Sequence, residues 1–120
     1  MDTPTRERAS QLFSALGHPT RLRIVETLVA GPMTVNQIAG VLGLSQSTTS
    51  QNLAILTRAG ILMVGQQGTS RHYRLRGPRV PAILALIEDF CRAHALYGVA
   101  DDSPVSTTVP VTDSETIRSS

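Results

Sequence analysis

Several residue types are scarce in this chain, and each scarcity excludes a class of protein. The single cysteine, Cys91, excludes an intrachain disulfide framework and zinc modules built from several cysteines. Tryptophan is absent, and with two Phe and two Tyr the core must be built from Leu, Ile, Val and Ala. No apolar run approaches the roughly 20 residues of a membrane helix, so we expect no spanning segment.

Charge and composition divide the 120 residues into regions. Every basic residue is an arginine; residues 1–100 carry ten of them against five acids, which favours an anionic partner. Residues 99–120 are rich in Ser, Thr and Asp and have no regular period, so we expect a disordered tail. In the rest of the chain, we expect a flexible arm over residues 1–5 and one domain over residues 6–98. No signal peptide is visible at the N-terminus, so we expect a cytoplasmic protein.

Apolar periodicity predicts a mainly helical domain with one small hairpin. Thr34 and Gln37 form a capping box before the third helix, and Gly43 suits its left-handed end. Ser45 is a good N-cap for the fourth helix. The expected helices are residues 6–16, 20–30, a third between Thr34 and Gly43, 46–58 and 79–96, with strands at 61–64 and 70–75. The order is four helices, two strands and one helix, which is that of a winged helix-turn-helix.

The third and fourth helices are separated only by a short turn at Gly43 and Leu44, which is typical of a helix-turn-helix. Residues 45–52 of the fourth helix read SQSTTSQN, a run of short hydroxyl and amide side chains. Such residues are poor helix formers but can hydrogen-bond to base edges and phosphates. The pattern predicts a DNA-recognition helix, the alternative being a solvent-facing polar helix.

The predicted hairpin concentrates positive charge. Arg71, Arg74, Arg76 and Arg79 lie within nine residues, with His72 and Tyr73 between the first two. A two-stranded wing beside a recognition helix would bring these cations to the DNA backbone. A solvated run of arginines on a surface hairpin is the alternative.

Three segments together resemble the ArsR/SmtB family of winged-helix repressors: ALGHPTRLRI at residues 15–24, QIAGVLGLSQST at 37–48 and LAILTRAGIL at 53–62. The resemblance covers about residues 8–96. It implies a homodimer joined by the first and last helices that binds double-stranded DNA at an inverted repeat. It also implies that Gln46, Ser47, Thr48, Ser50 and Gln51 face the groove, with Arg71, His72 and Arg74 contacting DNA from the wing.

The resemblance also implies control of DNA binding by a metal or another inducer. The family's Cys-x-Cys site on the third helix is absent, since residues 34–37 read TVNQ. On the last helix Asp89, Cys91 and His94 are candidate ligands for Ni²⁺ or Zn²⁺, although the family's downstream His pair is missing. Packing of these side chains in the dimer interface and thiol redox switching at Cys91 are alternatives. His18 with the N-terminus is a further metal candidate.

The sequence therefore predicts a dimeric DNA-binding transcriptional regulator. An enzyme is not expected, because three scattered histidines and one cysteine form no catalytic set, and residues 65–68 form a turn that does not bind phosphate. Two hypotheses remain as alternatives. One is a metal-independent regulator under redox or protein-partner control, and the other is a winged helix that binds proteins. A protein co-regulator is a possible partner.

Overall fold

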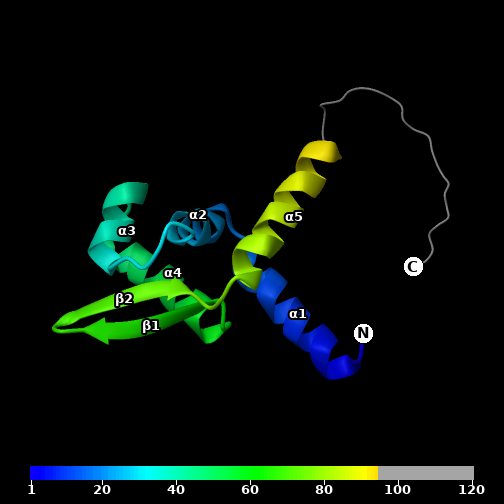
Figure 1. Cartoon of the computed structure of the whole chain (residues 1–120), viewed down its shortest axis with the longest axis horizontal. Coiled ribbons are helices and arrows are strands. Elements are labelled where there is room, and N and C mark those ends of the chain that lie inside the picture. The colour runs from blue at the N-terminus through cyan, green and yellow to red at the C-terminus, as the bar shows by residue number, and fades with distance from the viewer. Residues whose placement is uncertain (95–120) are drawn as a thin grey trace. The chain divides into compact units, whose positions relative to one another are not determined.

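The computed structural model describes residues 1–94, which form five helices and one antiparallel hairpin (Figure 1). In chain order the elements are α1 (Thr3–Leu16), α2 (Pro19–Leu28), α3 (Val35–Leu42), α4 (Gln46–Arg58), β1 (Leu62–Gln67), β2 (Ser70–Leu75) and α5 (Arg79–Ala93). This is the winged helix-turn-helix order, which confirms the fold expected from the sequence. The tail expected at residues 99–120 lies outside the described residues.

The first helix begins earlier than its apolar period indicates. The side chain of Asp2 accepts a hydrogen bond from the backbone N–H of Thr5 at 3.1 Å. Hydrogen bonding to the side chain of Thr5, and then to its backbone, lowers the pKa of the Asp2 carboxyl. Pro4 lies in the first turn, where its missing N–H costs no hydrogen bond. The helix therefore starts at Thr3, so residues 3–5, expected in a flexible arm, belong to α1.

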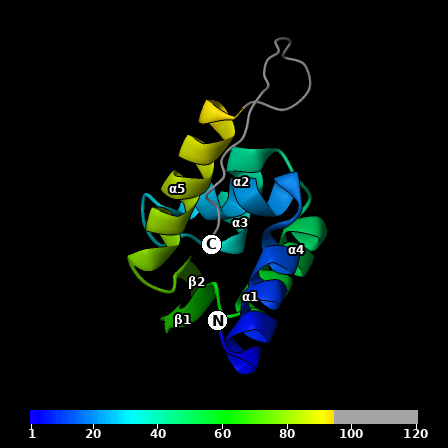
Figure 2. The same cartoon turned by 90° about the vertical axis from the view of Figure 1, so that its right-hand side faces the viewer.

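The core lies among the helices α2, α3 and α4, which are side by side in Figure 2, and it extends to the base of the hairpin. Leu53 and Leu56 of α4 are fully buried. They pack in one cluster with aliphatic side chains from the rest of the chain and with one aromatic side chain, Tyr73; the aliphatic members are Ala15, Ile24, Val25, Leu28, Ile38, Leu42, Ile61 and Leu62. As the composition predicts, this cluster is almost entirely aliphatic.

The hairpin is joined to the helices by a contact that the sequence pattern does not reveal. β1 pairs antiparallel with β2, in a register that sets Val64 opposite Tyr73 and Met63 opposite Arg74. Met33, just before α3, pairs with Tyr73 through two backbone hydrogen bonds of 3.0 and 2.8 Å. Tyr73 is also buried in the core. The wing is therefore fixed to the loop that leads into the helix-turn-helix.

The described chain divides into two compact units, residues 1–84 and a second that begins at Ala85. In the second unit Glu88 and Arg92 form an exposed ion pair of 2.7 Å along α5, of a kind that contributes little to stability. Leu86 and Phe90 are exposed apolar side chains on the same helix. Among residues 1–94, no helix is both long and apolar enough to cross a membrane.

Candidate nucleic-acid interface

Two short helices and a tight turn form the helix-turn-helix. Gly43 ends α3 with φ of 68°, a left-handed conformation that glycine adopts without steric cost. The backbone N–H of the next residue, Leu44, donates to the Ala39 carbonyl at 3.0 Å and closes the turn. Ser45 then caps α4 by accepting from the N–H of Thr48 at 3.0 Å. Each of these local features had a signal in the sequence.

The first two turns of α4 are polar and accessible on one side and buried on the other. Thr49 is 0% exposed, and its hydroxyl donates to the Ser45 carbonyl at 2.8 Å, so its burial leaves no hydrogen-bonding group unpaired. All five predicted groove-facing residues of this helix are exposed: Gln46, Ser47, Thr48, Ser50 and Gln51. The helix therefore presents hydroxyl and amide groups in the form that base edges and phosphates can use.

A groove of about 520 Å³ lies between α4 and the hairpin. Its lining includes Gln46 and Ser50 from α4 and Arg71 from β2. The guanidinium carbon of Arg71 lies 5.7 Å from the centre of the Tyr73 ring, a cation–π contact that holds the side chain along the strand. Arg71 is thus brought beside α4.

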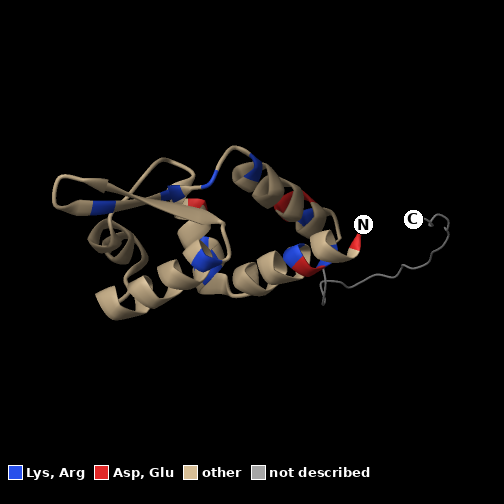
Figure 3. Ribbon diagram, turned by 90° about the horizontal axis from the view of Figure 1, so that it is seen from below, with Lys and Arg blue, Asp and Glu red and all other residues tan. Residues whose placement is uncertain are grey.

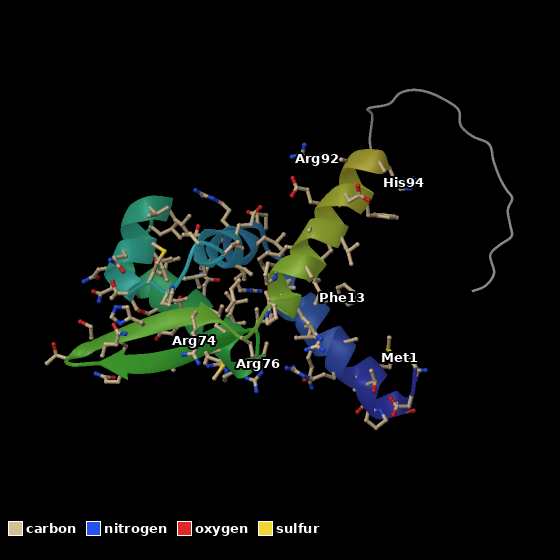
Figure 4. The ribbon with its side chains drawn as sticks, viewed as in Figure 1. Met1, Phe13, Arg74, Arg76, Arg92 and His94 are labelled. Atoms are coloured by element: carbon tan, nitrogen blue, oxygen red, sulfur yellow. The ribbon has the colours of Figure 1, made fainter. Side chains whose placement is uncertain are left out.

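Arg74 lies on the opposite face of the wing from Arg71. Side chains alternate along a strand, so residues three positions apart point to opposite sides of the sheet. One amino group of Arg74 contacts the sulfur of Met63 at 3.7 Å, and Figure 4 shows Arg74 and Arg76 projecting away from α3. His72 shares this face, and its Nδ1 is buried with no hydrogen-bond partner in the described chain. The predicted wing residues therefore divide between two surfaces.

Positive charge strongly outweighs negative charge in the first unit. Residues 1–84 contain nine arginines and three acids, Asp2, Glu7 and Glu26. Arginines mark the hairpin in Figure 3, and residues 62–75 include no acid. A surface of this kind attracts a polyanion and raises its association rate.

The candidate metal ligands do not converge within one protomer. Cys91 lies in α5 and His94 directly follows its last residue; both are exposed. The backbone N–H of His94 still donates to the Phe90 carbonyl at 2.9 Å, as in a helix, so the two residues, three positions apart, are neighbours on one face. Asp89 precedes Cys91 by two positions and points to the other side of the helix. Residues 1–94 contain no group of three His, Cys, Asp or Glu side chains placed to bind a metal ion. The ring of His94 instead contacts that of Phe90, with centroids 4.8 Å apart.

The remaining candidate, His18, is exposed at the N-terminus of α2 and makes no side-chain capping bond. At the N-terminus of α3, Thr34 and Gln37 are engaged in the capping box through bonds of 3.2 and 2.9 Å. Neither position gathers a ligand set.

Comparison with known proteins identifies the scaffold. A family model described as a helix-turn-helix domain matches residues 16–65. An HTH-type transcriptional regulator of Methanocaldococcus jannaschii is 38% identical over 84 residues, which are 69% of this chain and 94% of that protein. The biofilm growth-associated repressor of Xylella fastidiosa is 34% identical over 83 residues, 68% of this chain and 73% of its own length.

Together with these relatives, a solution structure from Mycobacterium bovis places the chain in a family. It is described as a homodimeric winged helix-turn-helix DNA-binding domain of a possible ArsR-family transcriptional regulator. It superposes with a TM-score of 0.72 at 26% identity, covering 82% of this chain and 92% of that one. The chain belongs to the ArsR family of winged helix-turn-helix transcriptional regulators. As an ArsR-family protein it is a regulator and not an enzyme, as the sequence predicted.

Sequence reasoning missed the role of Tyr73 in this ArsR-family protein. Tyr73 is buried, pairs with Met33 through its backbone, and supports the Arg71 guanidinium with its ring. A signal was present, since residues two apart on a strand share a face and Arg71 and Tyr73 are so spaced. Distinguishing the two faces requires knowing which one packs on the helices.

We predict that Arg71→Ala weakens binding to duplex DNA and flattens its salt dependence by about one unit in slope, because one phosphate contact is lost. Arg74→Ala, which removes the same charge from the opposite face, is the matched control and should flatten the slope less. The measurement is fluorescence anisotropy of labelled duplex over a salt series. Equal slopes for the two variants would contradict the division of the wing into two surfaces.

Proposed function

We propose that this ArsR-family regulator reads an inverted-repeat operator in double-stranded DNA as a homodimer, with α4 in the major groove. The observation that carries the proposal is the polar face of α4, on which every predicted groove-facing side chain is exposed while Thr49, Leu53 and Leu56 are buried. Arg71 beside this face supplies a cation for the adjoining phosphates. Phosphate contacts fix the register, and the hydroxyl and amide groups read bases.

Within this face Gln51 is the side chain suited to reading a base. A glutamine amide can donate to and accept from one adenine edge at the same time. Gln51 is exposed, and it follows Ser47 by one helical turn, so both lie on one surface of α4. Ser47 provides a single short hydroxyl there.

We predict that Gln51→Ala lowers the preference for operator over random duplex by about tenfold while leaving the salt slope unchanged. The operator is obtained by letting the wild-type protein select duplexes from a randomised pool. Asn36→Ala, an exposed amide on α3, is the control and should keep the preference. Failure of the wild type to enrich any sequence would overturn sequence-specific binding.

Exposed apolar side chains support the homodimer. Phe13 on α1 is 70% exposed, and Leu86 and Phe90 on α5 are 71% and 63% exposed. Side chains of this size are costly to leave in water and mark surfaces that a partner covers. The M. bovis relative is described as homodimeric, and a two-fold axis would set two copies of α4 about 34–36 Å apart, one turn of DNA.

We predict that Phe13→Glu converts the dimer into a monomer and lowers affinity for the selected duplex by at least about a hundredfold, since two half-sites are no longer bound together. Analytical ultracentrifugation at micromolar concentration gives the oligomeric state. Val41→Glu adds the same charge at an exposed position of α3 and should remain dimeric. A monomeric wild type that binds the duplex tightly would contradict the proposal.

Metal control through the end of α5 is a second candidate, favoured by the exposed pair of Cys91 on α5 and His94 just after it, which lie on one face. One protomer offers two ligands, and two protomers offer two thiolates and two imidazoles, a set that Zn²⁺ accepts and Ni²⁺ tolerates. Such a site would link the protomers and bias their relative orientation, hence the spacing of the recognition helices. Asp89, on the other side of the helix, is left out of this set.

We predict that Cys91→Ser and His94→Ala each weaken Zn²⁺ or Ni²⁺ binding in calorimetry, whereas Asp89→Ala binds like the wild type. Binding should also weaken in more acidic solution, because protons compete with the metal for the imidazole and the thiolate. If metal acts as the inducer, it should change DNA affinity by about 5–150-fold, with the reciprocal effect of DNA on metal affinity. A wild type that binds neither metal more tightly than about millimolar would exclude this control.

A further inference from the structure

Arg21 is a charged side chain in the interior of the first unit. Its exposed fraction is 9%, and within residues 1–94 no carboxylate lies within ion-pair distance of its guanidinium. An arginine stays protonated at any accessible pH, so this group must be stabilised by dipoles and hydrogen bonds. Its burial is expensive unless its partners are held in place.

One partner is the end of the first helix. The Nε of Arg21 donates to the carbonyl oxygen of Ala15 at 2.6 Å. This carbonyl belongs to the last turn of α1, where carbonyl groups lack helical partners and the helix dipole is negative. Arg21 thus completes the C-terminal end of α1 with a positive charge.

The other partner is the recognition helix. The Nη1 of Arg21 donates to the side-chain oxygen of Asn52 at 3.2 Å, across 31 positions of sequence. The amide nitrogen of Asn52 in turn donates to the backbone carbonyl of Thr48 at 2.9 Å, one turn earlier on α4. A continuous set of hydrogen bonds therefore runs from the end of α1 to the turn that carries Thr48 and Gln51.

Polar side chains line part of the space between α1 and α4. A pocket of about 440 Å³ lies between α1 and α4, lined by Ser10, Gln11, Ser14, Ala15, Arg21, Ile55 and Ala59. Half of the α1 side chains that line it are serines, which do not interlock with α4 as large apolar residues would. The hydrogen bonds of Arg21 therefore add a directional restraint to the apolar contacts that Leu12, Leu16 and Ile55 make with the core.

We propose that Arg21 is a positioning residue for DNA reading: through Asn52 it holds the base-reading turn of α4 to the end of α1. The inference rests on the proposed function, because it assigns a role to Arg21 in presenting the face that reads DNA. Arg21 is too buried to touch DNA itself. Since α1 is also the helix that carries Phe13, one guanidinium contacts both the helix proposed for the dimer interface and the helix proposed to read DNA.

Two variants break the connection at different points. Arg21→Met keeps most of the length of the side chain but removes all its donors, and Asn52→Ala removes the acceptor at a half-buried position where truncation should not prevent folding. Arg23→Met is the matched control, an exposed arginine of the same helix that loses the same charge. Arg21→Lys, which keeps the charge but cannot reproduce a guanidinium's divergent donors, should restore only part of the function.

Amide hydrogen exchange of the free, full-length protein is the first measurement. Arg21→Met and Asn52→Ala should speed exchange about tenfold in the first two turns of α4 relative to α3, with Arg23→Met unchanged. A merely structural loss would speed exchange in α2, α3 and α4 together. Unchanged protection of α4, or an equal loss in every helix, would overturn the proposal.

DNA binding is the second measurement, with a selected duplex of about 30 base pairs, three helical turns, and a random duplex of equal length. Both variants should lose about tenfold in preference for the selected duplex with an unchanged salt slope, and the double variant should lose no more than the larger single loss. Additive losses, or a flattened slope, would overturn the proposal. If the wild type selects no duplex, the proposed function fails, and the exchange measurement still decides whether Arg21 holds α4.

Discussion

The burial of three side chains of α4 sets the direction in which the rest of that helix faces. Leu53 and Leu56 lie in the aliphatic core, and Thr49 joins them one turn earlier because its hydroxyl finds the Ser45 carbonyl. Each residue turns a helix by about 100°, so fixing these positions also fixes Ser47 and Gln51 on the outer side. A polar helix with no inward anchor could rotate. Here the apolar anchors convert a run of hydroxyl and amide groups into an oriented surface.

Much of this arrangement could be predicted because its signals are local. The limits of α4 agree with those expected, since a capping serine begins it and Gly60, with φ of 78°, follows its end. The capping box of Thr34 and the left-handed Gly43 could also be predicted, because each signal lies within three or four consecutive residues. The early start of α1 had its own signal in Asp2, which caps the helix before any apolar residue appears. Periodicity alone does not detect a polar first turn.

The features that escaped prediction depend on contacts between distant parts of the chain. Arg21 and Asn52 meet across 31 positions, and neither residue's neighbours indicate the other. The arginines of the wing were seen as one cluster, but which face of the hairpin packs on the helices decides that Arg71 adjoins α4 and Arg74 does not. In α5, spacing in sequence placed Asp89 near Cys91, whereas the helical rotation separates them. The sequence pattern shows which residues are near one another along the chain, but it does not show toward which neighbouring element each side chain points.

The bridge between Met33 and Tyr73 bears on how the chain folds. Its two hydrogen bonds join segments about forty residues apart, whereas the caps and turns of α3 and α4 close over three to five residues. Closing a long loop costs more chain entropy than closing a short one. This entropy is lost before the contact can stabilise the folded chain. We therefore expect the helix-turn-helix to assemble first and the wing to dock on it afterwards. A nascent chain would then hold a formed α4 before Arg71 reaches its side.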